Sequence, residues 1–279
     1  MAKKLRIGIV GCGAIGTSLA KTIVNQFAGQ ARLVCFYDID KNKALLLAAS
    51  LKKDGFPGLH SIVSFSLDNL IQRTGLVIEA AQAKSSLAIA RSVLRKGRDV
   101  MVMSVGGIAA HINQLRQLAK SNQAKLYIPS GAICGIDAIK AASQRKIRKV
   151  ILLTRKNPNS FGYSDYLKKR GIKLDKIKKD TILFSGAARE AIKLFPQNIN
   201  VAATLSIAGI GAARTRVKIM ACPKVKRNIH EIYIESDAGV ISTRVENLVH
   251  PDNPKTSFLA VLSAIATLRQ ILDPVRIGT

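Results

Sequence analysis

Apolar and polar positions alternate in a regular way over the first 40 residues. An apolar run at residues 5–10 leads into a glycine-rich turn, and apolar residues then recur at helical spacing over residues 17–27. A second apolar run, residues 31–37, ends at Asp38. This order predicts a buried strand, a tight turn, a helix, a second strand and an acidic residue at that strand's carboxyl end.

The same alternation continues to about residue 130. The pattern predicts further helices over residues 42–53, 67–73, 85–96 and 108–122, and strands over residues 62–63, 76–80, 99–103 and 125–128. Strands that alternate with helices at this spacing are typical of an α/β fold with a parallel, doubly wound sheet. We therefore predict an N-terminal Rossmann domain.

The pattern changes after the Pro129-Ser130-Gly131 break. A helix is predicted over residues 134–144 and an amphipathic helix over residues 256–272, whereas residues 156–179 are loop-like and basic. Longer strand-like runs cover residues 149–154, 200–205, 215–220, 230–236 and 239–245. These runs predict an α+β second domain with a mostly antiparallel sheet.

The glycine-rich turn has the spacing of a dinucleotide-binding motif. Gly11 permits the tight turn, Gly13 leaves room for a pyrophosphate, and Gly16 lets helix and strand pack closely. Asp38 follows 22 residues after Gly16, where it can accept hydrogen bonds from ribose hydroxyls. The carboxyl ends of later strands should line the same crevice. We expect the cofactor to contact Gly11, Gly13, Ala14, Ile15, Gly16, Asp38, Ala80, Ala81 and Ser104.

Asp38 also bears on the choice of cofactor. Its charge repels a 2′-phosphate, which favours NAD over NADP. Lys41 and Lys43 follow closely and would offset part of this repulsion. We expect NAD to be preferred and NADP to be accepted as a second, weaker cofactor.

The net charge of +27 is high for an otherwise ordinary globular composition of 48% hydrophobic and 22% charged residues. Fourteen Lys and Arg lie between residues 140 and 179, against Asp165, Asp175 and the adjacent Asp180. Such a field attracts anions, including nucleic acid, or is simply a solvated lysine-rich surface. Aromatic residues are only 5% and Trp is absent, so nucleic acid is the less favoured partner.

Two features bear on compartment and metals. The longest late apolar stretch, residues 258–268, is shorter than the ~20 residues that span a bilayer, and we expect a cytoplasmic protein. The four cysteines form no C-x-x-C pair, so no metal site is predicted.

Proton transfer near neutral pH favours histidine. Among four histidines, His230 is the first candidate because it starts an alternating strand of the second domain, and His250 is the second. Either residue is alternatively a structural histidine. The run Asn253 to Ser257 opens the last predicted helix, where it forms an anion site or a simple helix cap.

Four runs in the second half resemble the L-aspartate dehydrogenase family: residues 130–138 (SGAICGIDA), 195–205 (FPQNINVAATL), 227–232 (RNIHEI) and 253–257 (NPKTS). Cys134 and the stretch from residue 157 to 161 depart from the family pattern. The resemblance covers nearly the whole chain in the same order.

The resemblance implies NAD(P)-dependent oxidation of L-aspartate to iminoaspartate, which hydrolyses to oxaloacetate and ammonia or feeds NAD biosynthesis. His230 matches the family's catalytic histidine, and Ala132 and Asn200 match its cofactor-contacting residues. We expect the substrate carboxylates to meet Asn198, Lys255, Thr256 and Ser257.

The family further implies a homodimer and a C-terminal helix that returns to the Rossmann domain. The expected boundaries are residues 1–131 with 254–279 for the cofactor domain, and residues 132–253 for catalysis and dimerisation. Two alternatives stay open. One is a related enzyme of the homoserine dehydrogenase or dihydrodipicolinate reductase type, and the other is a non-enzymatic NAD-binding regulator.

Overall fold

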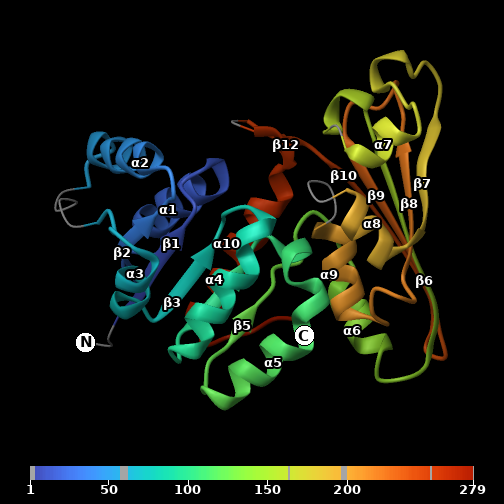
Figure 1. Cartoon of the computed structure of the whole chain (residues 1–279). Helices are drawn as coiled ribbons and strands as arrows, with labels where there is room; N and C mark the ends of the chain where they lie inside the picture. The colour runs from blue at the N-terminus through green and yellow to red at the C-terminus, as the bar shows by residue number, and fades with distance from the viewer. Residues whose placement is uncertain (1–3, 57–61, 163, 196–199, 252, 279) are drawn as a thin grey trace. The chain divides into compact units, whose positions relative to one another are not determined.

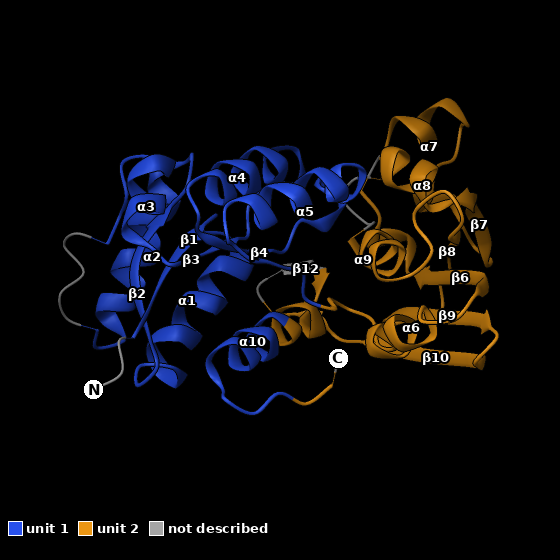
Figure 2. Cartoon of the chain, turned by 90° about the horizontal axis from the view of Figure 1, so that it is seen from below, with its two compact units in different colours: residues 1–129, 264–276 blue, residues 130–263, 277–279 orange. Residues whose placement is uncertain are grey.

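The computed structural model describes residues 4–56, 62–162, 164–195, 200–251 and 253–278. The chain divides into two compact units, Met1–Pro129 with Ala264–Arg276, and Ser130–Ser263 with Ile277–Thr279 (Figure 2). The second crossing between them falls inside the last helix, α10 (Phe258–Leu272). Only the later turns of α10 therefore belong to the first unit.

The first unit is built on a parallel sheet of five strands in the order β2-β1-β3-β4-β5 (Figure 1). The strands are β1 (Leu5–Val10), β2 (Ala31–Tyr37), β3 (Leu76–Glu79), β4 (Asp99–Val102) and β5 (Leu126–Tyr127). Val63 forms a single parallel bridge to Phe36 of β2, where the sequence pattern predicts a short strand. The order is that of a Rossmann sheet whose outermost strand is reduced to one bridge, and the predicted doubly wound fold is confirmed.

Helices cover both faces of this sheet (Figures 1 and 2). They are α1 (Ala14–Gln26), α2 (Lys41–Lys53), α3 (Leu67–Arg73), α4 (Ala83–Arg95) and α5 (Ile112–Ser121). Ile7 and Ile9 of β1 share one core cluster with α1, α2 and the Ala264 and Leu268 turns of α10. On the opposite face, a Cβ at Gly8 would lie 2.9 Å from a methyl carbon of Leu70 in α3. A glycine here lets α3 lie against the strand.

The second unit holds a mixed sheet in the order β10-β9-β6-β8-β7, in which only the β6–β8 pair is parallel. The strands are β6 (Ile147–Lys156), β7 (Thr181–Ala187), β8 (Arg216–Ala221), β9 (Asn228–Ser236) and β10 (Gly239–Asn247). The predicted, mostly antiparallel sheet is confirmed. Helices α6 (Ile136–Ala142), α8 (Ala188–Leu194) and α9 (Asn200–Ala208) cover one face and form a core with Val150, Leu152, Ile232 and Ile234.

The predicted strand over residues 200–205 is wrong, because these residues begin helix α9. Residues 201–206 are all buried, so this helix is apolar on every side and its sequence lacks the 3.6-residue period that distinguishes a helix from a buried strand. Ala202, Ala203 and Ala208 favour the helix. Strand β7 and helix α8 follow the basic segment and were not predicted at all.

Short elements complete the second unit. The basic segment includes the one-and-a-half-turn helix α7 (Asp165–Lys169) between two 3-10 turns, Pro158–Ser160 and Leu174–Lys176. Strands β11 (Val249–His250) and β12 (Asn253–Ser257) pair just before α10. Within the described residues no helix is long and apolar enough to cross a membrane.

Candidate active site

The glycine-rich turn of the first unit fits a bound pyrophosphate. Gly11 has φ of +100°, and a Cβ there would lie 2.5 Å from the carbonyl oxygen of Ala80. A Cβ at Gly16 would lie 1.9 Å from the carbonyl oxygen of Gly11, so both positions exclude a side chain. Gly13 differs, since a Cβ there would meet nothing within 4 Å. It keeps open space in front of the N-terminal N–H groups of α1, which is where an anion binds.

Asp38 is fixed at the carboxyl end of β2. Its Oδ2 accepts a hydrogen bond from the Cys12 backbone N–H at 2.7 Å, and its Oδ1 accepts one from the Asp40 N–H at 2.9 Å. Each carboxylate oxygen keeps a further lone pair for a ribose hydroxyl. Burial, with a smaller contribution from Asp38, raises the pKa of the Cys12 thiol to about 12. Cys12 is therefore a protonated thiol and not a nucleophile.

A buried carboxylate clamps the ends of β3 and β4. Glu79 is fully buried; its Oε1 accepts from the Ala81 N–H at 2.9 Å and its Oε2 from the Ser104 N–H at 3.0 Å. The Ser104 hydroxyl donates to the Ala81 carbonyl at 2.9 Å. Burial raises the pKa of Glu79, against the effect of these N–H donors. The sequence pattern identified Ala81 and Ser104 but not the carboxylate that holds them; the charged end of the apolar run Leu76–Glu79 was the available signal.

His230 lies on the helix-covered face of β9 and is 3% exposed. Its Nδ1 is 3.0 Å from the hydroxyl of Thr154, which lies directly opposite on β6. Burial lowers the pKa of His230 to about 3, and the charge of Lys156 adds to this shift. The imidazole is therefore neutral at physiological pH and can accept a proton.

One end of this buried sheet face is polar, in contrast to its apolar centre. The polar side chains are Thr154 and Lys156 of β6, Asn228 and His230 of β9, Asn247 of β10, and Ser257 of β12, all at most 9% exposed. Asn228 donates to the Ser257 hydroxyl at 3.5 Å, and Asn247 donates to the Ala132 carbonyl at 3.0 Å. The structure therefore brings together three of the predicted residues, Ala132, His230 and Ser257.

Other predicted residues lie differently. Thr256 and Ser257 belong to strand β12, and α10 begins only at Phe258, so the prediction that the 253–257 run opens the helix is wrong. Pairing of β12 with β11 extends this run before the helix starts. Asn200 is the exposed first residue of α9. Asn198 and the side chain of Lys255 lie outside the described residues.

His250, the second candidate base, is also buried. Its ring makes an edge-to-face contact with Phe258, with 5.6 Å between the ring centroids. This contact fits a structural role at the junction of β11 and α10.

Lys156, Thr154 and Asn228 were missed by sequence reasoning. The alternation of Val150, Leu152, Thr154 and Lys156 on one face of β6 is visible in the sequence and places a lysine at an inward position. Their grouping with His230 is not visible, because it depends on the register between strands about 76 residues apart.

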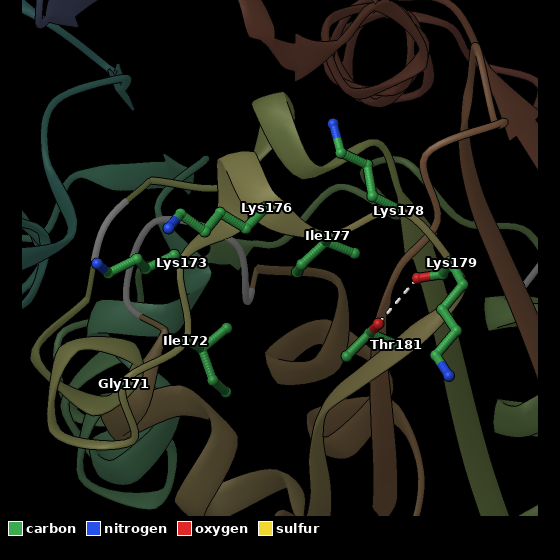
Figure 3. A pocket seen from close by; sticks show the side chains of 8 residues that line it. All are labelled: Gly171, Ile172, Lys173, Lys176, Ile177, Lys178, Lys179 and Thr181. Carbon is green, nitrogen blue, oxygen red and sulfur yellow. Dashed lines mark hydrogen bonds between the residues drawn. The ribbon is translucent and has the colours of Figure 1, made fainter.

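The basic segment forms a separate surface feature. A hollow of about 480 Å³ is lined by Gly171, Ile172, Lys173, Lys176, Ile177, Lys178, Lys179 and Thr181. Lys178 and Lys179 point away from each other, and neither points toward Lys173 or Lys176 (Figure 3). Their ammonium groups do not converge on one ligand, so the hollow is not built as a small-anion site.

A Rossmann sheet with a pyrophosphate turn and a fixed acid after β2, joined to a mixed sheet with a buried neutral histidine, defines a pyridine-nucleotide-dependent oxidoreductase. Residues 11–129 match the sequence profile "Homoserine dehydrogenase, NAD binding domain", and residues 137–271 match "Aspartate dehydrogenase, C-terminal".

Full-length relatives narrow the class. The chain is 47% identical to the L-aspartate dehydrogenase of Methanosarcina barkeri and 40% identical to that of Methanocaldococcus jannaschii, in each case over 99% of this chain and 100% of the relative. The chain therefore belongs to the L-aspartate dehydrogenase family. Its fold is similar to that of aspartate dehydrogenase from Thermotoga maritima, with a TM-score of 0.74 at 24% identity, over 99% of this chain and 100% of that one.

Proposed function

We propose that the chain oxidises L-aspartate to iminoaspartate with NAD as the preferred cofactor, and that the imine hydrolyses to oxaloacetate and ammonia. The observation that carries this proposal is the buried, neutral His230 held by Thr154 at the polar end of the second sheet. The 47% identity to a full-length L-aspartate dehydrogenase supports the substrate. The test is steady-state reduction of NAD and NADP with L-aspartate, and the reverse reaction with oxaloacetate plus ammonia. The proposal fails if purified protein turns over neither.

His230 acts as the base in this proposal. When bound, the nicotinamide ring accepts the hydride that leaves Cα of the substrate. The substrate ammonium must first lose a proton, because the nitrogen lone pair forms the new C=N bond. His230 takes that proton at Nε2, provided that its Nδ1–H donates to the Thr154 hydroxyl. After oxidation the substrate is a protonated imine, and the imidazole removes a proton from the water that attacks its carbon.

Thr154→Val tests the orientation of the imidazole. The variant keeps the β-branched shape but loses the hydroxyl at 3.0 Å from Nδ1, so the ring loses the partner that fixes its tautomer. We expect kcat to fall about 10–100-fold, as for partners that orient a functional histidine, with little change in the KM for NAD. A kcat equal to that of the wild type at every pH would contradict the assignment. Thr215→Val is the matched control, because this buried threonine donates to the Gly211 carbonyl in a local turn.

The preference for NAD is proposed from Asp38, whose carboxylate is held at the end of β2. Asp38→Asn removes the charge that repels a 2′-phosphate. A hydrogen bond to a charged group is worth about 1.5–3 kcal/mol, so the ratio of kcat/KM for NAD to that for NADP should fall about 10–100-fold. Asp40→Asn, which changes an exposed cap of α2, is the control. An unchanged ratio in the Asp38 variant would show that another residue selects the cofactor.

We further propose a homodimer formed through the open face of the second sheet. Half-buried Ile151, Leu153 and Tyr233 line a hollow of about 400 Å³ there, beside a row of alternating charges. Glu231 pairs with the side chains of Arg155 at 3.0 Å and Arg244 at 2.7 Å. Such a row is self-complementary across a two-fold axis. Light scattering should give twice the 30.1 kDa of one chain, and a monomer at micromolar concentration would overturn this proposal.

A further inference from the structure

A lysine lies inside the second unit where an apolar residue would cost less. Lys156 ends strand β6 and is 6% exposed. A buried ammonium is expensive unless it is compensated, and an apolar side chain of similar volume at such a position is often neutral or stabilising. A buried cation at the end of a strand is therefore a sign of a ligand that carries negative charge.

The register of the sheet places this cation beside the proposed base. Thr154 pairs with His230 and Arg155 pairs with Ile229, so Lys156 lies one residue further along, on the same face as Thr154. The charge of Lys156 lowers the pKa of His230, which is consistent with their proximity. Both residues belong to the polar end of the sheet described above.

A second observation at this end of the sheet also points to a polar ligand. Asn247 pairs with Asn228 across β10 and β9 and is 3% exposed. Its Nδ2 donates to the Ala132 carbonyl, but its Oδ1 has no hydrogen-bond partner among the described residues. A buried amide oxygen without a partner is costly, and a ligand N–H would satisfy it. An amino acid with an extra carboxylate offers both the anion and the N–H.

We infer that the Lys156 ammonium binds a carboxylate of the dicarboxylic amino acid substrate, an inference that rests on the proposed function. The pairing also couples binding to catalysis. In the free protein the cation disfavours a proton on His230. A bound carboxylate compensates that cation, so the imidazole becomes a stronger base only when the substrate is in place.

The inference is tested with Lys156→Met and, as a second variant, Lys156→Gln. The probes are L-aspartate as substrate, succinate as an unreactive dicarboxylate, and butyrate as a monocarboxylate of the same length. We expect the KM for L-aspartate and the Ki for succinate to rise together, about 10–100-fold, which is the usual weight of a charge-assisted contact. The KM for NAD should stay within about twofold, and butyrate should inhibit both proteins equally weakly. Lys149→Met, on the exposed face of the same strand, is the control.

Two outcomes overturn the assignment. One is a succinate Ki and an aspartate KM that are unchanged in both variants. The other is an equal loss of affinity for NAD and for L-aspartate, which would indicate general damage to the fold. Failure of the proposed function is a separate result: wild-type protein would then not oxidise L-aspartate, while calorimetric titration with succinate would still show whether Lys156 binds a dicarboxylate.

Discussion

Replacing His230 with alanine should lower kcat for L-aspartate oxidation by about 10²–10⁴-fold, the usual contribution of a general base. The residue is nearly inaccessible and its imidazole is kept neutral by burial and by the charge of Lys156. Removing it leaves the substrate ammonium without a proton acceptor. The Rossmann turn and Asp38 are untouched, so the KM for NAD should stay within about twofold. Steady-state kinetics with both substrates varied separates the two effects.

The pH dependence of the same reaction gives an independent check. The pKa of His230 in the free protein is about 3, well below its usual 6.5. Because the base is already neutral above pH 3, kcat/KM should show no histidine limb near pH 6.5 in the wild type. His250→Ala is the matched control, since this buried histidine contacts Phe258 instead. That variant should lose stability yet keep its kcat, and a wild-type kcat in His230→Ala would remove His230 from the mechanism.

The cofactor half was readable from the sequence because its signals are local. Gly11, Gly13, Gly16 and Asp38 act through backbone conformation and spacing within one strand–turn–helix–strand unit. The structure gives each glycine a separate physical reason, and only Gly13 faces open space. What the pattern did not predict is Glu79, whose function depends on N–H groups from the ends of two different strands.

The second half was less readable, because its site depends on pairing between distant strands. His230 was found from the alternation that begins β9, with support from the family resemblance. Its contacts with Thr154 and Lys156 depend on the β6–β9 register, which a sequence without an alignment does not contain. Helix α9 was mistaken for a strand because a helix buried on all sides has no polar face to mark its period.

Lys156→Met is expected to make the protein more stable while making it a poorer enzyme. Burial lowers the pKa of Lys156 from 10.5 to about 8, so the folded state resists the proton that the unfolded chain holds. Since one pKa unit corresponds to about 1.4 kcal/mol, the penalty in the folded protein is about 3 kcal/mol below pH 8. Methionine fills a similar volume without a charge and should recover most of this free energy.

The sign of this effect can be checked by varying pH. Between pH 8 and pH 10.5 the unfolded chain binds more protons at this position than the folded one, so the stability of the wild type rises with pH through that window. The advantage of Lys156→Met in the free energy of unfolding should therefore be largest near pH 7 and vanish near pH 10.5. Urea unfolding at the two pH values measures it, with Lys149→Met as the exposed control. A variant that is less stable than the wild type at pH 7 would mean that the fold itself needs the ammonium. A variant that is more stable there but binds L-aspartate weakly would mean that the lysine is retained for its ligand at the expense of stability.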